Sequence, residues 1–563
     1  MEGQLTQLRW WQTRTFVLFA ALVSAIPLLW PDIPPMVDLP GHMGRYRVQL
    51  AIHDYPWLSD WYDFRWSLIG NLGIDLLIIP LSKVFGLELA VKLIVMTIPP
   101  LTVTGLLWIA REVHGRIPAT ALFALPLAYC FPFHFGFVNF ALSMALGLNA
   151  FGLWLRLART GHLRLRAAIF VPISCLIWLC HTFGWGTLGI LAFSAEMIRQ
   201  HDMRKDGRGH RWFNAWVRAG IGCLPLAVPM ALMIFWRSGD HVTGVTGDWF
   251  NWRAKSGWLT MVLKDRWMVF DVASTAVVYF VLFKSARDSA VKLAYRFGIG
   301  KTQPPDGEIE FSRNLGLSAL FLLAVFVLLP RIVFGSAYAD MRLAPFMLAI
   351  AVIALRPRDG VSMRGAANIA ALGLAFFLVR TAGTTISFWI YDQSYDRQLK
   401  ALDHVPIGAK LISFVGEECG NQWFMTRLEH LPAIALERRL AYSNDQWSMP
   451  GAQLLTTRYD AAKKFAHDSS QIVTSSQCPR EWWRPISRSL ALFPRDAFDY
   501  VWLIIPPAYD PRFNQGLDEV WRDGSSVLFK IDHNVPAAKL SAEEMAPLIR
   551  AAQIRAARGL PPN

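Results

Sequence analysis

Apolar segments, most of them 15 to 25 residues long, recur between residues 15 and 390, separated by short polar or basic stretches. An α-helix needs about 20 such residues to cross ~30 Å of hydrocarbon. The pattern therefore predicts a polytopic all-α membrane bundle of about eleven crossings over residues 1–391. The segments are 15–30, 71–85, 87–109, 118–133, 136–157, 167–179, 184–197, 219–236, 267–284, 315–334, 343–355 and 366–390.

Clusters of Lys and Arg predict the orientation of this bundle, because basic loops stay on the cytoplasmic side of a membrane. A basic stretch precedes the first apolar segment, which predicts a cytoplasmic N-terminus and an external loop at residues 31–70. The basic loops at 156–166 and 199–218 should also be cytoplasmic, so an even number of crossings must separate each of them from the N-terminus. Segment 71–85, broken by Pro80 and Lys83, is our candidate for a re-entrant or interfacial piece. Further basic loops at 284–301 and 356–364 leave everything after Tyr391 outside.

The pattern changes after Tyr391. Short apolar runs at 411–415, 500–505 and 526–531 predict strands, and 401–405, 459–466 and 541–557 predict helices. We therefore expect an extracytoplasmic α/β or α+β domain over residues 392–563. Cys419 and Cys478 are its two cysteines, and an isolated pair in an oxidising compartment is a disulfide candidate; two buried free thiols are the alternative.

Composition supports a membrane protein and excludes other classes. The chain is 53% hydrophobic and contains 24 Trp and 36 Phe, which is unusual for a soluble protein. Its net charge of +14 could suggest nucleic acid, but the basic residues lie in short clusters between apolar runs. We therefore expect membrane lipid around the chain and no nucleic-acid partner.

The first external loop carries the strongest candidate chemistry. Asp32, Asp38, His42 and Arg45 follow the first apolar segment closely, among several prolines. A carboxylate, an imidazole and a guanidinium together can orient an acceptor, move a proton and hold a phosphate. The alternative for Asp38 is an Asx turn or a helix cap.

This organisation resembles the GT-C superfamily of integral-membrane glycosyltransferases. The resemblance rests on the cytoplasmic N-terminus, the Asp just past the first helix, the many spans and the exported C-terminal domain. Four pieces are also similar to a bacterial branch of GT-C-like proteins whose first loop commonly reads D-Y-P-N-H-L-A-R. This chain departs from it with Leu39 and Gly41 where the branch has Tyr and Asn. The pieces are Pro34–His42, Asn71–Asp75, Gly136–Phe140 and Asp340–Pro345.

The resemblance implies an enzyme of the bacterial inner membrane. It would transfer a sugar from a polyprenyl-phosphate donor to a glycan, lipid or protein acceptor on the external face. Asp38 would be the general base, with Asp32 as the alternative, and His42 and Arg45 lie on the same loop motif. An arginine would pair with the donor phosphate as negative charge develops on it.

Other polar residues are weaker candidates. Asp75 lies in an apolar run and should face the protein interior or an aqueous cavity. His181 could line a substrate cavity, or its ring could form hydrogen bonds between helices without a role in binding. Asp340 and Arg342 could form an internal ion pair or a phosphate site, and we favour Arg342 as the phosphate ligand. Glu417, Glu418 and His430 are expected to be ordinary surface residues.

No cofactor follows from the sequence. Ligand spacing typical of a zinc or calcium site is missing, although the first-loop aspartates could hold a divalent ion. Nucleotide-binding motifs are missing too. The competing functions are a transporter or flippase of a lipid-linked intermediate, and a non-catalytic GT-C-like scaffold.

Overall fold

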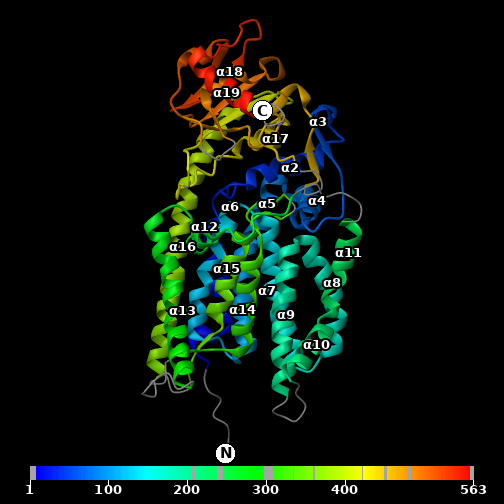
Figure 1. Cartoon of the computed structure of the whole chain (residues 1–563), viewed down its shortest axis with the longest axis vertical. Coiled ribbons are helices and arrows are strands. Elements are labelled where there is room, and N and C mark those ends of the chain that lie inside the picture. Colours follow the sequence, from blue (N-terminus) through cyan, green and yellow to red (C-terminus); the bar gives the residue numbers. More distant parts are fainter. Residues whose placement is uncertain are drawn as a thin grey trace, which may run out of the picture.

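A computed structural model describes residues 8–203, 211–237, 245–296, 309–333, 335–358, 362–420, 422–448, 453–478 and 483–557. A bundle of helices makes up the N-terminal part, and a mixed α/β domain sits on one end of the bundle (Figure 1). This arrangement agrees with the sequence-based expectation of a helical part followed by an α/β domain. The expected basic loops fall partly on residues 204–210, 297–301 and 359–361, which lie outside the described residues.

The helices of the bundle follow the apolar segments closely. They are α1 (Arg14–Ala25), α4 (Gly73–Phe85), α5 (Leu87–His114), α7 (Val138–Arg159), α8 (Leu163–Cys180), α9 (Thr182–Asp202), α10 (Trp212–Gly222), α11 (Val228–Arg237), α12 (Trp252–Thr260), α13 (Met268–Arg296), α14 (Arg313–Leu328), α15 (Ala339–Ile353) and α16 (Met363–Leu399). Segment 118–133 differs, because it forms a 3₁₀-helix, η3 (Ala119–Tyr129), followed by the short α6 (Phe131–Phe135). Pro118, Pro126 and Pro132 lack the N–H that a regular α-helix needs there.

Among the described residues, five helices are long and apolar enough to cross a membrane, and the pair α10–α11, bent by 45°, makes a sixth candidate. Large apolar side chains point outward from the bundle, including Leu22 (63% exposed), Phe280 (67%) and Leu372 (64%). Such a surface is stable in hydrocarbon and unfavourable in water. These features indicate a membrane protein. Helix α4 has 13 residues, about 20 Å of helix, which is short for a crossing.

Two polar contacts join segments between the helices at one end of the bundle. Arg313 pairs with Asp202 at 2.7 Å, and Arg9 donates to the carbonyl oxygen of Met363 at 3.1 Å. Helix α10 lies towards this end, and the C-terminal domain lies at the opposite end (Figure 1). The basic stretches near Arg9, Asp202 and Met363 are therefore placed on one side, as their charge predicted.

The C-terminal domain is built on a six-stranded mixed sheet with the order β7-β6-β4-β8-β10-β9. Strands β7, β6, β4 and β8 are parallel, and β8, β10 and β9 are antiparallel. The three predicted strands are present as β4, β8 and β10. Strands β6, β7 and β9 were missed. Strands β6 and β7 have only three and two residues, and β9 is a partly exposed edge strand with four charged residues, so its pattern is not apolar. The strands are β4 (Leu411–Gly416), β6 (Ile472–Thr474), β7 (Arg484–Pro485), β8 (Tyr500–Ile504), β9 (Leu517–Asp523) and β10 (Ser526–Ile531).

The segment 31–70 packs with the C-terminal domain. It contains α2 (Leu39–Ala51), α3 (Pro56–Trp61) and β1 (Tyr62–Phe64), and β1 pairs antiparallel with β5 (Leu455–Thr457). Trp57 donates to the carbonyl oxygen of Leu440 at 3.1 Å. Helix α16 runs through the expected domain boundary at Tyr391 and ends at Leu399. Residues 31–70, α16 and the C-terminal domain therefore form one continuous assembly.

Cys419 and Cys478 form a disulfide, with their Cα atoms 5.4 Å apart. This matches the pairing expected from the sequence and is consistent with an extracytoplasmic C-terminal domain. The bond ties the segment after β4 to the segment after β6, at the carboxyl ends of these two inner strands. Residues 422–431, which follow Cys419 closely, contact the bundle.

Replacing both disulfide cysteines by serine should destabilise the C-terminal domain. The bridge closes a loop with a sequence separation of 59 residues, for which chain entropy gives ~4 kcal/mol. We expect this loss in urea-dependent proteolysis of the domain in the full-length protein. Cys175→Ser, which removes a free thiol, is the matched control. Alkylation of Cys419 and Cys478 in the unreduced folded protein would contradict the bridge.

Candidate functional site

The loop that carries Asp38 is fixed through its backbone from the helical part. The Asp38 N–H donates to the carbonyl oxygen of Phe135 at 2.9 Å. Gly136 follows α6 with φ +99°, and a Cβ on it would lie 2.8 Å from the Asp38 nitrogen. Only glycine allows both this backbone conformation and the close approach. The piece Gly136–Phe140 therefore supports Asp38 directly.

The same loop is held from the opposite side by the C-terminal domain and α16. Arg427 donates to the carbonyl oxygen of Pro35, and the Tyr395 hydroxyl donates to the carbonyl oxygen of Met36 at 3.2 Å. Pro35 also restricts the backbone by its own ring. Contacts on both sides therefore fix the backbone of Asp38 at the junction between the bundle and the C-terminal domain.

The Asp38 carboxylate is the unusual feature of this junction. Its residue is only 9% exposed, yet among the described residues the carboxylate has no hydrogen-bond or ion-pair partner, and it does not cap α2. Burial raises the pKa of Asp38 well above its ordinary value; the negative charge of Asp468 raises it further, and the positive charge of Arg342 opposes this. A buried carboxylate normally has partners, so this one is available to a ligand.

Arg342 is the cation that acts on Asp38. Its guanidinium lies over the ring of Phe137, 4.0 Å from the centroid, and donates to the Ser336 hydroxyl at 3.3 Å. In the described part of the chain no carboxylate lies within ion-pair distance of it. Arg342 therefore keeps donors free for an anion.

His181 lies near Arg342, at the break between α8 and α9. Its Nδ1 accepts the Phe183 N–H at 3.1 Å, and its ring packs edge-on against Phe140 with centroids 5.7 Å apart. The charge of Arg342 acts on His181 as well as on Asp38. His181 is thus near the same group of charges and is partly satisfied by a local hydrogen bond, so both of its expected roles stay open.

The C-terminal domain contributes charges that the sequence analysis missed. Burial raises the pKa of Glu429 well above its usual range, and the negative charges of Glu417, Asp38 and Asp468 add to the effect, while Lys264 opposes it. Glu429 has no hydrogen-bond or ion-pair partner among the described residues. These side chains come from separate stretches of the chain, and no local motif marks them.

An aromatic cluster covers the start of α2. The Trp447 ring lies between the rings of His42 and His430, with centroid distances of 4.9 and 4.4 Å. A Cβ on Gly41 would lie 2.7 Å from Trp447, so the glycine is needed for this approach. His430 is 4% exposed, which corrects its expected place on the surface. Burial lowers the pKa of His42 well below its ordinary value, so His42 is neutral here.

Arg45 and Asp75 form a buried pair with each other. Arg45 Nη1 lies 2.6 Å from Asp75 Oδ1, and Asn139 donates to Asp75 Oδ2 at 3.0 Å. Asn139 also accepts the Ile74 N–H at 2.7 Å. Asp75 faces the protein interior as expected, whereas Arg45 already has a carboxylate partner and is 2% exposed. This placement favours a supporting role for Arg45 over phosphate binding.

Asp340 and Asp32 lie apart from the Asp38 carboxylate. Asp340 pairs with Lys255 at 3.2 Å and accepts the Trp258 Nε1–H at 3.1 Å, so its ionic partner is Lys255 and not Arg342. Asp32 is exposed, and its charge acts on Asp392 of α16. Asp32 and Asp38 therefore do not form the expected acidic pair. Within the described residues, no group of three or more His, Cys, Asp and Glu side chains could hold a metal ion.

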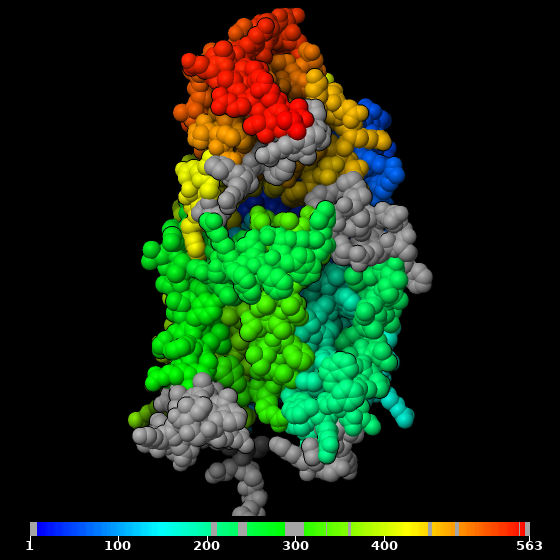
Figure 2. All heavy atoms as spheres, in the orientation of Figure 1, coloured from blue at the N-terminus to red at the C-terminus, as the bar shows by residue number. Residues whose placement is uncertain are grey.

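Residues of the four pieces Pro34–His42, Asn71–Asp75, Gly136–Phe140 and Asp340–Pro345 meet around this site. Gly136 supports Asp38, Asn139 binds Asp75, and Arg342 lies on Phe137. Figure 2 shows a hollow between the C-terminal domain, in orange and red, and the green helices below it, with dark blue atoms from the start of the chain visible inside. The site is thus assembled where the two parts of the protein meet.

Comparison with known proteins gives no assignment for this chain. No model of a known protein family matches the sequence, and no curated protein matches it either.

Variants of Arg45 and Arg342 should distinguish an arginine that stabilises the fold from one that binds a ligand. Arg45→Met leaves Asp75 buried without its ionic partner, which should cost ~3–5 kcal/mol. Arg342→Met removes an arginine without a carboxylate partner among the described residues, so it should leave stability nearly unchanged. Thermal unfolding in detergent, followed by tryptophan fluorescence, compares the two. Equal melting temperatures for Arg45→Met and the unmodified protein would contradict the supporting role.

Proposed function

We propose that this protein is a membrane glycosyltransferase of the GT-C type. It transfers a sugar from a polyprenyl-phosphate donor to a glycan, lipid or protein acceptor on the external face of the bacterial inner membrane. The helical part crosses the membrane about eleven times with the N-terminus in the cytoplasm. Asp38 is the general base, and Arg342 binds the donor phosphate.

One observation carries this proposal: a buried carboxylate and a nearby arginine interact electrostatically, yet neither has a close partner of opposite charge among the described residues. Asp38 and Arg342 influence each other, but no ion pair within 4.0 Å joins them. Arg45, a buried arginine of the same loop, is in contrast paired with Asp75. Burying unpaired charges is unfavourable, and such groups mark sites where a ligand completes the arrangement.

The proposed reaction uses each group once. The acceptor hydroxyl gives its proton to the Asp38 carboxylate as its oxygen attacks the anomeric carbon of the sugar. The bond between that carbon and the phosphate oxygen breaks, and the electron pair leaves with the phosphate. Arg342 binds the negative charge that develops there. Attack opposite to the leaving group inverts the configuration at the anomeric carbon.

The surroundings of Arg342 suit the donor. The rings of Phe137 and Phe183 lie 4.0 and 6.0 Å from its guanidinium carbon, next to helices whose outer surface is apolar. A polyprenyl phosphate needs a cation for its headgroup and apolar surface for the first units of its chain. The hollow below the C-terminal domain offers space for an acceptor (Figure 2).

Asp38→Asn should abolish transfer and leave the fold intact. Asparagine keeps the size of the side chain but accepts no proton, so the rate should fall by ~10²- to 10⁴-fold. Sugar transfer from radiolabelled polyprenyl-phosphate sugars in membrane extracts is the readout, and Asp32→Asn is the control because Asp32 is exposed. Arg342→Met should instead mainly raise the donor concentration needed for half-maximal rate.

The pH profile gives a second readout of Asp38. A base acts only when deprotonated, and burial raises the pKa of Asp38, so the rate should increase with pH through that raised pKa. The profile should be unchanged in Asp32→Asn. Transfer that survives Asp38→Asn would reject the base. If no sugar donor supports transfer but liposomes containing the protein move a lipid-linked sugar, the transporter or flippase is correct; neither activity would favour the scaffold.

Reporter fusions test the proposed orientation separately. Alkaline phosphatase, which folds only outside the cytoplasm, should be active when fused after Leu399, where α16 ends. It should be inactive when fused after Asp202 or Arg358, near the basic end of the bundle. Cytoplasmic β-galactosidase fusions at the same positions should give the opposite result. Phosphatase activity after Asp202 would place the site on the wrong side of the membrane.

A further inference from the structure

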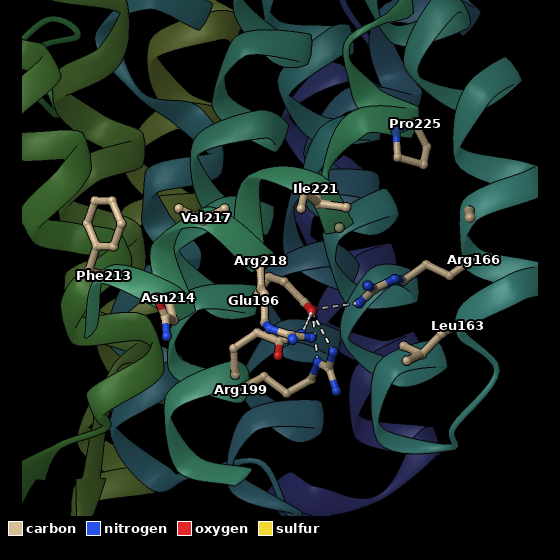
Figure 3. Close-up of a pocket in the computed structure, with 13 residues that line it drawn as sticks. Leu163, Arg166, Glu196, Arg199, Phe213, Asn214, Val217, Arg218, Ile221 and Pro225 are labelled. Carbon is tan, nitrogen blue, oxygen red and sulfur yellow. Dashed lines mark hydrogen bonds and ion pairs between the residues drawn. The ribbon is translucent and has the colours of Figure 1, made fainter. Parts of the chain in front are cut away.

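A second site lies at the end of the bundle opposite the C-terminal domain. Helices α8, α9 and α10 line an open cavity of about 790 Å³ there. Arg166 and Arg199 reach the carboxylate of Glu196 from two sides, at 3.1 and 2.9 Å, and Arg218 lies beside them (Figure 3). The cavity is separate from Asp38 and takes no part in the proposed reaction.

The charges in this cavity do not balance. Three arginines line it with one glutamate, and that glutamate already accepts hydrogen bonds from two of the arginines. Arg166 is 4% exposed and also lies over the ring of Trp154, 3.9 Å from its centroid. In the described part of the chain, Arg218 has no carboxylate partner. An excess of positive charge next to apolar helices favours a bound anion.

Part of the cavity wall is apolar and faces outward. Phe213 is 74% exposed and Ile221 is 61% exposed, and both line the cavity together with Val217 and Pro225. Phe213, Val217 and Ile221 follow one another at a spacing of four residues on α10, which also carries Arg218, and Pro225 lies just after this helix. A soluble anion needs only the arginines, whereas a membrane lipid would use both the arginines and the apolar wall.

We propose that this cavity binds the phosphodiester headgroup of an anionic membrane phospholipid. The phosphate lies between Arg218 and the Arg166–Glu196–Arg199 group, and the acyl chains follow Phe213 and Ile221 into the bilayer. With the C-terminal domain outside, as proposed above, the cavity meets the cytoplasmic leaflet. Clustered arginines at the cytoplasmic surface of a membrane attract the anionic headgroups of that leaflet.

Native mass spectrometry of the full-length protein tests the site. The protein in detergent is titrated with phosphatidylglycerol or with phosphatidylcholine that has the same acyl chains. We expect phosphatidylglycerol to bind more tightly, and Arg218→Gln to weaken it roughly tenfold by losing a charge-assisted hydrogen bond. Arg211→Gln is the matched control, because Arg211 is exposed and does not line the cavity.

A second variant tests the apolar wall. Ile221→Gln keeps every charge but should also weaken phosphatidylglycerol, because the acyl chains lose an apolar contact. Inorganic phosphate at millimolar concentration should not displace the lipid. Equal binding of both phospholipids, equal effects of Arg218→Gln and Arg211→Gln, or displacement by phosphate would each overturn the proposal. None of these results depends on sugar transfer.

Discussion

Arg427 joins the two parts of this protein. Its side chain is fully buried, pairs with Asp265 just before α13, contacts His134 Nδ1 at 3.2 Å and donates to the carbonyl oxygen of Pro35. A buried charge has lost its hydration, so removing one ionic partner costs ~3–5 kcal/mol. The C-terminal domain, the bundle and the loop that carries Asp38 are therefore stable in this arrangement only together.

Much of the fold follows from the hydrophobic pattern, because segment length alone distinguishes membrane-spanning helices from strands. The pattern gave the bundle, the change near Tyr391 and the strands β4, β8 and β10. It could not give β9, whose exposed side chains are charged, or the 3₁₀ geometry of η3. It also could not show that β1 pairs with β5, because that contact joins residues almost 400 positions apart.

The site was predictable only in part. Asp38 was a candidate because prolines and a nearby apolar segment mark its loop. Arg342 was a candidate only as a charged residue near Asp340, and the sequence did not show that α15 would bring it close to Asp38. Arg45 looked equally suitable, since sequence does not show that α2 turns it towards Asp75. Glu429 carries no local signal, because burial and charges from several distant stretches of the chain raise its pKa.

The contacts that fix the loop of Asp38 favour the proposed enzyme over a transporter. A transporter must rearrange the helices around its substrate to open each side in turn. Here the Asp38 loop is fixed to α6 by Phe135, to α16 by Tyr395 and to the C-terminal domain by Arg427. Moving the bundle against the domain would break buried ionic contacts of Arg427. A general base on a fixed backbone, in contrast, meets the need of proton transfer for a short and constant distance to an acceptor hydroxyl.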